Sequence, residues 1–507
     1  MKNTTTWILF VFSAVVWILV SLWVAPQPNG PDVMIFRDAG WNLAAHGHFE
    51  TRGIIYASDL RPQLFAHYTP LMPLLFAAYL KIFPQNAYAG TLFNLLLGYV
   101  ASAITLFWVL RSPAEGWLKK ITVLALAIFP LGMMTNDRPE ALGLILSVLF
   151  LSYAARDQSK PWMNGMLAAM VFLGEPYAAL MALVWFTFLT LARNWKKPRR
   201  WISSIYELSV AGAIFGLILG AVALVYYGID HQSLHRFAEH ALGGHSGAGV
   251  VLQNKQGYLQ KLSSMMVWQS LHWVGGATIH ELYAVAPVIF ILGYTFWVIV
   301  NLRRFTPSQR LLSVAGVVVA LVTVFLFPIQ YNYLEFVPFF IAVCLIFCEP
   351  REGMQKPALL LVLLSLLFIN LPDELFGIPV RYTERSSYRE EQAQLDFVSS
   401  HLQSANSVVA FNGEVYDVYK ARFPNIFNTF YLPQNRVMDI SEVRAFANCY
   451  RAYNGQSGEA KPLPKGINAA DFYLAQADPK HAHALIFRHK LTNAEWGFGC
   501  DVYLRNR

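Results

Sequence analysis

The sequence predicts a polytopic α-helical membrane protein with about eleven transmembrane helices and a small C-terminal α/β domain outside the cytoplasm. Three observations predict this fold class. Of the 507 residues, 55% are hydrophobic and only 14% are charged, whereas soluble proteins carry roughly 25% charged residues. Apolar runs of about membrane-spanning length recur through residues 1–371. The remaining tail is polar, so a wholly soluble protein is excluded, and nothing indicates a nucleic-acid-binding protein.

The first apolar run is expected to remain as a membrane anchor, because it lacks a clear small-residue cleavage site for a signal peptidase. The expected spans cover residues 7–24, 89–110, 121–135, 140–155, 162–174, 176–192, 208–228, 283–301, 311–328, 336–348 and 357–371. The apolar stretch that begins at Pro70 has only about 14 residues, which is too short to span a bilayer. We expect it to form a helix that lies along the outer interface.

The distribution of Lys and Arg predicts the orientation, because basic loops are retained in the cytoplasm. With the N-terminus inside, the inner segments carry 16 Lys and Arg residues, whereas the short outer connections hold only Arg138. An odd number of spans then places the C-terminus outside. We therefore expect a transmembrane domain over residues 1–371, with outer loops at 25–88 and 229–282, and a soluble domain over 372–507. The net charge of +8 agrees with cytoplasmic loops that contact anionic membrane lipids.

The polar tail is expected to alternate strands with helices. Short β-like runs begin at Ser407, Ala470 and His483. Cys449 and Cys500 would face an oxidising compartment, where they can pair. Cys344 and Cys348 lie one helical turn apart in a span, so they are expected to be packing residues.

The spans favour an enzyme over a transporter. No expected span carries a charged residue in its middle, whereas transport pathways usually place charges or broken helices there. The one comparable break is Gly174-Glu175-Pro176, and we expect Glu175 at an outer hairpin, level with the lipid headgroups. Charged residues and histidines gather instead in the outer loops, which suits chemistry on a lipid-anchored substrate. A transporter or flippase of a lipid-linked glycan is the alternative.

The stretch PDVMIFRDAGWNLAAHGHFE, residues 31–50, follows the first span and predicts an amphipathic helix led by an acid. The residues alone leave two interpretations of Asp32. It is either an N-cap that accepts hydrogen bonds from the next turn or a general base at the outer membrane face. Asp38, two turns further on, is expected to be a solvated interfacial charge, and the alternative is that it substitutes for a second catalytic acid.

The first span, the acid that opens the outer loop, the amphipathic helix and the His-x-x-Pro stretch at His67 together resemble the GT-C superfamily of integral-membrane glycosyltransferases. The protein O-mannosyltransferase and lipid A aminoarabinose transferase branch is the most similar. The segment NDRPEALGL, which begins at Asn136, is similar to the second acidic motif of that branch. The resemblance covers residues 1–290 in layout, and the tail is similar only to the variable soluble domains of many members.

The resemblance implies a glycosyltransferase of the cytoplasmic (inner) membrane with its active site outside. Such an enzyme moves a sugar, with inversion, from a polyprenyl-phosphate donor to an envelope glycan, lipid or protein acceptor. Phosphate is a good leaving group, so the reaction needs a carboxylate to deprotonate the acceptor and cationic groups to hold the departing phosphate.

Two acids match the acidic motifs of the superfamily. Asp32 matches the first-loop acid, which is the catalytic base or its organiser, although most relatives have a second acid where this chain has Val33. Asp137 matches the second-loop acid. Asp137, Pro139 and Glu140 also have the pattern of a helix start, so a capping role is the alternative.

The resemblance also implies groups that bind the donor phosphate or sugar. His67 and Arg138 would contact the phosphate, or else anchor their segments in the interface. Three further candidates lie in the later outer loop: His235, Arg236 and His240. His231 and His235 have a spacing that can bind zinc, but no HExxH pattern or cysteine accompanies them. No metal cofactor is therefore predicted, and a divalent ion is the less favoured alternative.

Overall fold

A computed structural model describes part of the chain. The described residues are 3–23, 31–51, 63–65, 68–111, 140–156, 158–195, 197, 199–229, 231–232, 234, 292–326, 396, 400, 408–412, 420, 426–428, 443–453, 456–457, 485–493 and 498–505. The chain divides into two compact units. The helical unit comprises Met1–Val15 and Leu95–Phe376, and the sheet unit comprises Val16–Asn94 and Gly377–Arg507.

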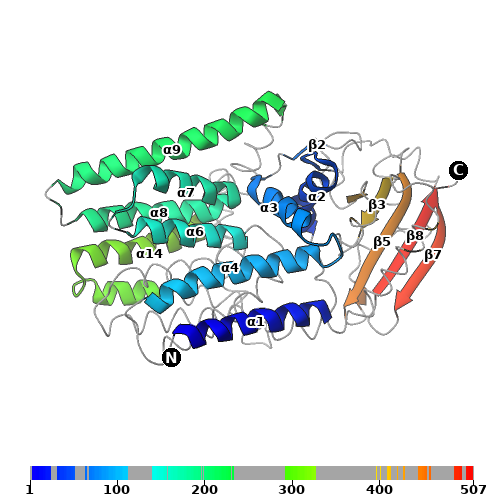
Figure 1. Ribbon diagram of the computed structural model, residues 1–507, viewed down its shortest axis with the longest axis horizontal. Helices are drawn as coiled ribbons and strands as arrows, with labels where there is room; N and C mark the ends of the chain where they lie inside the picture. The colour runs from blue at the N-terminus through cyan, green and yellow to red at the C-terminus, as the bar shows by residue number, and fades with distance from the viewer. Residues whose placement is uncertain are drawn as a thin grey trace. The chain divides into compact units, whose positions relative to one another are not determined.

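The helical unit is built from long apolar helices that lie side by side (Figure 1). They are α1 (Asn3–Trp23) and α4 (Ala89–Arg111), which cross the unit boundary, and α6 (Glu140–Ala154), α7 (Pro161–Gly174), α8 (Pro176–Asn194), α9 (Arg200–Ile229), Leu292–Asn301 and α14 (Pro307–Leu326). Proline opens α7, α8 and α14, and its fixed φ suits the first helical position.

Close packing joins these helices. Phe150 of α6 and Phe186 of α8 meet with ring centroids 5.1 Å apart. A Cβ added to Gly165 of α7 would overlap the carbonyl oxygen of Ala211 on α9. A small residue at this position therefore lets two helix backbones approach each other, as in membrane helix pairs.

Three helices within the described ranges are long and apolar enough to cross a membrane. They are Thr4–Trp23, Pro176–Asn194 and Arg200–Ile229. Large apolar side chains are exposed on α9, such as Leu217 at 69% and Leu224 at 71%. Water would make such exposure unfavourable, whereas lipid would not. The molecule is a mostly helical membrane protein in its first part.

Helices occupy most of the expected spans that the structure describes. The helix α9 begins at Arg200, eight positions before the expected span. The expected span was placed on the continuous apolar run, and the first two turns of the helix also contain polar residues. Expected spans 121–135, 336–348 and 357–371 lie outside the described residues, and 283–301 is described from Leu292 onward. The total of eleven and the orientation stay predictions.

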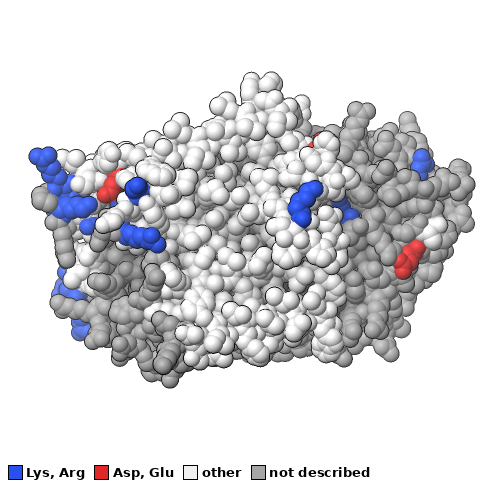
Figure 2. All heavy atoms as spheres, in the orientation of Figure 1, with Lys and Arg blue, Asp and Glu red and all other residues white. Residues whose placement is uncertain are grey.

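The described Lys and Arg residues of the helical unit lie at one set of helix ends. They are Arg111, Arg156, Lys160, Arg193, Lys197, Arg199, Arg200, Arg303, Arg304 and Arg310. Figure 2 shows basic side chains gathered at this end, where α8 ends and α9 begins. This is the distribution that the positive-inside rule requires of a cytoplasmic face.

The sheet unit contains two helices from the first loop. These are α2 (Pro31–His46) and α3 (Leu71–Ile82), with the short strands β1 (Glu50–Thr51) and β2 (Gln63–Leu64) between them. The helix α3 occupies the stretch that was predicted to form an interfacial helix, so the helix is confirmed. Its place at a membrane interface stays a prediction.

The C-terminal strands of the sheet unit form a mixed sheet in the order β4-β3-β5-β8-β7, with β6 paired to β5. They are β3 (Val408–Asn412), β4 (Ile426–Asn428), β5 (Val443–Tyr453), β6 (Gln456–Ser457), β7 (Leu485–Asn493) and β8 (Phe498–Arg505). The strand β3 pairs in parallel with β4 and β5, whereas β8 pairs antiparallel with β5 and β7. Two predicted strands, at Ser407 and His483, coincide with β3 and the start of β7, and the one at Ala470 lies outside the described residues.

Candidate active site at the first loop

The helix α2 begins at Pro31, so the backbone of Asp32 lies in its first turn. Proline at the first helical position is pre-shaped for this start. An acid in the first turn also interacts favourably with the helix dipole. The side chain of Asp32 lies outside what the structure describes, so its role as base or cap stays a prediction.

The helix α2 packs tightly against α3 through aromatic contacts. The rings of Trp41 and Phe76 meet edge to face with centroids 6.1 Å apart. The guanidinium of Arg37, which is 1% exposed, lies 5.7 Å from the centroid of the same Phe76 ring. A desolvated cation over an aromatic face contributes about 2 kcal/mol. A Cβ added to Gly40 would come within 2.9 Å of both Phe76 and the carbonyl oxygen of Pro73, so the two helices are in direct contact.

Asp38 forms a buried ion pair with Lys420. Its Oδ1 lies 2.7 Å from the Lys420 Nζ, and the two side chains are 0% and 3% exposed. Its Oδ2 accepts a hydrogen bond of 2.9 Å from the hydroxyl of Thr51. The prediction that Asp38 is a solvated interfacial charge is therefore wrong. A partner from the C-terminal part of the chain compensates its charge, and no pattern around Lys420 in the sequence indicates this pairing.

The buried ion pair gives the first loop a fixed geometry. Burying two charges costs several kcal/mol each, and only close geometry with further hydrogen bonds offsets this cost. Asp38 has such an additional bond from Thr51, and it belongs to the helix that begins with Asp32. The contact links α2 to the residues that precede β4, far along the chain.

The loop that follows α2 turns back onto the helix. Gly47 has φ of +76°, a conformation that favours glycine, and its N–H donates to the Leu43 carbonyl at 3.1 Å. The side-chain amide of Asn42 then donates to the carbonyl of Glu50 at 2.7 Å, which holds β1 beside the helix.

The segment around His67 lies against α2. The ring of Tyr68, which is 5% exposed, meets Phe36 edge to face at 5.2 Å between centroids. Phe36 stands one turn after Asp32 on the helix. The residue that follows His67 therefore packs against the helix that begins with the Asp32 motif. His67 itself lies outside the described residues.

The other predicted site residues are not described. Asp137, Arg138, His235, Arg236 and His240 all lie outside the described residues. The helix α6 begins at Glu140, directly after the second acidic motif. His231 is exposed beyond the end of α9, where its ring stacks on Tyr227 with centroids 4.0 Å apart. Among the residues searched, which are the described ones, no group of three potential metal ligands occurs.

Glu175 lies at the turn between α7 and α8, as predicted, and it is buried. Its side chain is 0% exposed, and its Oε1 accepts a hydrogen bond of 3.3 Å from the N–H of Tyr177 at the start of α8. The cause is close packing against α6, because a Cβ added to Gly143 would overlap the Glu175 side chain. Its level in the membrane stays a prediction.

No known protein family and no curated protein matches the chain in sequence. Among solved structures, the chain is similar to the oligosaccharyltransferase of Archaeoglobus fulgidus, whose crystal structure holds a tethered acceptor peptide containing the NVT sequon. The two share 11% sequence identity with a TM-score of 0.40, and the match covers 100% of this chain and 74% of that chain.

Proposed function

We propose that this protein is a membrane glycosyltransferase of the GT-C type. It moves a sugar from a polyprenyl-phosphate donor to an envelope glycan, lipid or protein acceptor at the outer face of the cytoplasmic membrane, and Asp32 is its base. The observation that carries this proposal is the fixed first-loop helix. The motif that resembles the superfamily forms the rigid helix α2, with Asp32 in its first turn and a buried ion pair two turns below.

The proposed reaction is a single displacement at the anomeric carbon. The Asp32 carboxylate accepts the proton of the acceptor hydroxyl while the acceptor oxygen bonds to that carbon. The bond between the carbon and the phosphate oxygen breaks, and its electron pair leaves with polyprenyl phosphate. Attack opposite the leaving group inverts the configuration. The groups proposed to stabilise the departing phosphate are His67, Arg138, His235, Arg236 and His240.

Rigid placement of α2 matters for this chemistry. Misplacing a catalytic group by about 1 Å can lower a rate by roughly 10²-fold. The Asp38 and Lys420 pair and the Arg37 contact with Phe76 oppose such movement of α2. We propose no metal in the reaction, because the two acids stand in separate loops and no dense carboxylate cluster accompanies them in the sequence.

The test is transfer by the purified full chain in lipid nanodiscs, with a panel of polyprenyl-phosphate sugars and crude envelope acceptors. Release of free polyprenyl phosphate is followed by mass spectrometry. Asp32→Asn keeps the size of the side chain but removes the base, so release should fall by about 10² to 10⁴-fold. Asp396→Asn is the matched control, because Asp396 is an exposed acid of the same unit. Near-normal turnover in Asp32→Asn would exclude Asp32 as the base.

A transporter or flippase of a lipid-linked glycan is the second candidate, and the buried Glu175 favours it. Intramembrane carboxyl groups beside helix breaks often mark transport pathways. Glu175 sits between α7 and α8, at such a break. A flippase would move the intact donor across proteoliposomes without releasing polyprenyl phosphate. Loss of this movement in Glu175→Gln, with no release from any donor, would favour transport over transfer.

A further inference from the structure

The first turns of α6 pack closely against the break between α7 and α8. Gly143 stands in the first turn, and a Cβ added there would lie 2.5 Å from the Glu175 Cβ and 2.8 Å from the Ala178 Cβ. A Cβ added to Gly174 would lie 2.8 Å from the Leu146 Cδ1. Each glycine therefore stands where a larger residue would overlap its neighbours, and the two glycines let the helix start and the break approach each other.

Hydrogen bonds on both sides fix the break itself. The N–H of Glu175 donates to the Val171 carbonyl at 2.7 Å, where α7 ends. The Glu175 Oε1 accepts a hydrogen bond of 3.3 Å from the N–H of Tyr177 and so caps α8. Pro176 has a fixed φ at the first position of α8. One buried residue thus ends one helix and begins the next, so α6 packs against a well-defined part of the fold.

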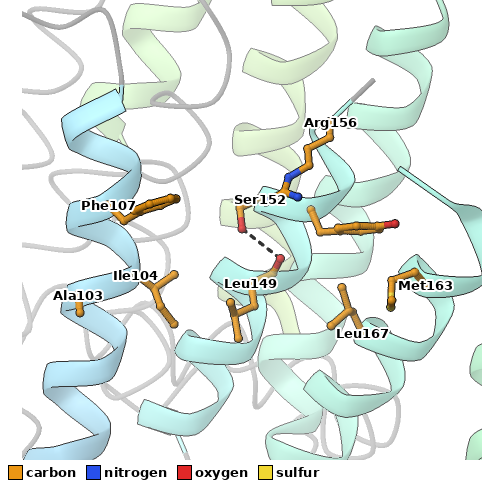
Figure 3. Close-up of a pocket in the computed structure, with 9 residues that line it drawn as sticks. Ala103, Ile104, Phe107, Leu149, Ser152, Arg156, Met163 and Leu167 are labelled. Atoms are coloured by element: carbon orange, nitrogen blue, oxygen red, sulfur yellow. Dashed lines mark hydrogen bonds between the residues drawn. The ribbon is translucent and has the colours of Figure 1, made fainter. Parts of the chain in front are cut away.

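The later turns of α6 pack less closely on the side that faces α4 and α7. A cavity of about 520 Å³ lies there. Its lining includes Leu149 and Ser152 of α6, Phe107 of α4 and Leu167 of α7 (Figure 3). Packing on this side therefore constrains α6 less than the contact at Gly143 does.

The start of α6 matters because the second acidic motif precedes it directly. Asp137 is three positions before Glu140, the first residue of the helix. Three residues of chain reach at most about 11 Å. The position of the helix start therefore limits where Asp137 and Arg138 can lie.

We propose that Gly143 and Glu175 are positioning residues that hold the second acidic motif at the active site. The inference rests on the proposed function, in which Asp137 is a catalytic acid. With alanine at position 143, the new Cβ would have to move from 2.5 Å to at least 3.4 Å from the Glu175 Cβ to reach ordinary contact, a displacement of about 1 Å. A displacement of about 1 Å can lower a rate by roughly 10²-fold.

The test compares three glycine-to-alanine variants of the full chain in lipid nanodiscs. The kcat of polyprenyl-phosphate release is measured per folded molecule, and thermal unfolding is followed by tryptophan fluorescence. Gly143→Ala should lower kcat by roughly 10²-fold. Gly165→Ala is the stability control, because its Cβ would overlap the Ala211 carbonyl oxygen on α9. It should lower the unfolding temperature at least as much as Gly143→Ala but keep kcat within twofold.

Gly212→Ala is the second control, because a Cβ at this position of α9 meets nothing within 4 Å. It should change neither kcat nor the unfolding temperature by much. Equal losses of kcat in Gly143→Ala and Gly165→Ala would overturn the proposal, because a general loss of packing would explain both.

Glu175 supplies a further test, which also holds if Gly143→Ala does not fold. Glu175→Gln keeps the length of the side chain and its capping oxygen, so kcat and its pH profile should match those of the unmodified protein. Glu175→Ala removes the cap and should lower kcat by about 10 to 10²-fold. A changed pH profile in Glu175→Gln would overturn the proposal in favour of a titrating carboxyl group.

Hydrogen exchange separates this inference from the proposed function, because it needs no substrate. Gly143→Ala should raise amide exchange about tenfold in the peptide that covers the start of α6, whereas Gly165→Ala should not. If exchange rises but the unmodified chain releases no polyprenyl phosphate from any donor, the contact is supported and the proposed function fails. Unchanged exchange together with unchanged kcat in Gly143→Ala would overturn this inference alone.

Discussion

Each unit of the molecule contains an ion pair that is shielded from water, partly in one unit and almost fully in the other, and the two pairs join very different parts of the chain. In the helical unit, Arg193 near the end of α8 pairs with Glu207 near the start of α9, and their side chains are 9% and 13% exposed. In the sheet unit, Asp38 of α2 pairs with Lys420, and both are almost fully buried. The first pair links consecutive helices, whereas the second links the first loop to the C-terminal segment.

The partners around each pair differ as well. Arg193 also donates to the carbonyl oxygens of Ala154 and Arg156 and to the Ser159 hydroxyl, so it satisfies several acceptors at the end of α6. Partial exposure leaves water available if one of these bonds is lost. Asp38 and Lys420 lie in a drier place, at 0% and 3% exposure. The local pair therefore stabilises a helix end, whereas the distant pair holds α2 in position.

The largest effect is expected from breaking the distant pair. Lys420→Met leaves the Asp38 charge buried, so the free energy of unfolding should fall by about 3–5 kcal/mol. Thermal unfolding in micelles, followed by tryptophan fluorescence, measures the change. In variants that still fold, glycosyl transfer should fall by roughly 10²-fold because α2 loses its position.

The double variant Asp38→Leu, Lys420→Met is the control for that prediction. It removes both charges, so it should recover most of the lost stability. Equal stability of Lys420→Met and the unmodified protein would contradict a close pair between these two side chains.

The same contrast explains what the sequence could predict. Spans, the α3 helix and strand β3 follow from local periodicity, which needs only neighbouring residues. Lys420 and Asp38 are far apart in the chain, and the sequence around Lys420 does not indicate that the two side chains meet. The burial of Glu175 could not be predicted for a related reason, because it depends on Gly143 of another helix.

The second largest effect concerns another long-range link in the sheet unit. Cys449 of β5 and Cys500 of β8 are partner positions in the antiparallel register. Such partners have Cα atoms about 4.5–5.5 Å apart, within the range that disulfides need. In an oxidising compartment, we expect both thiols to give up their protons and two electrons to a thiol–disulfide oxidoreductase and to form one bond.

Peptide mapping without reductant would detect this link as a joined peptide pair. Cys449→Ser should then lower the free energy of unfolding by about 2–4 kcal/mol. Cys344→Ser serves as the control, because its thiol is expected to pack in a span. Two free thiols in protein isolated from membranes would contradict both the link and an outer location of this domain.

The smallest of these effects is expected from the local pair. Glu207→Gln removes the charged partner of Arg193, and hydrogen bonds to charged groups contribute about 1.5–3 kcal/mol. The loss should be at the lower end of this range, because Arg193 keeps its bonds to the end of α6. Lys197 also approaches Glu207, at 3.8 Å, but its side chain is 49% exposed. An exposed pair contributes about 0–1 kcal/mol, so Lys197→Met should barely change thermal unfolding. If Lys197→Met cost as much as Glu207→Gln, the stability at this end would come from net charge, and the contrast between local and distant pairs would fail.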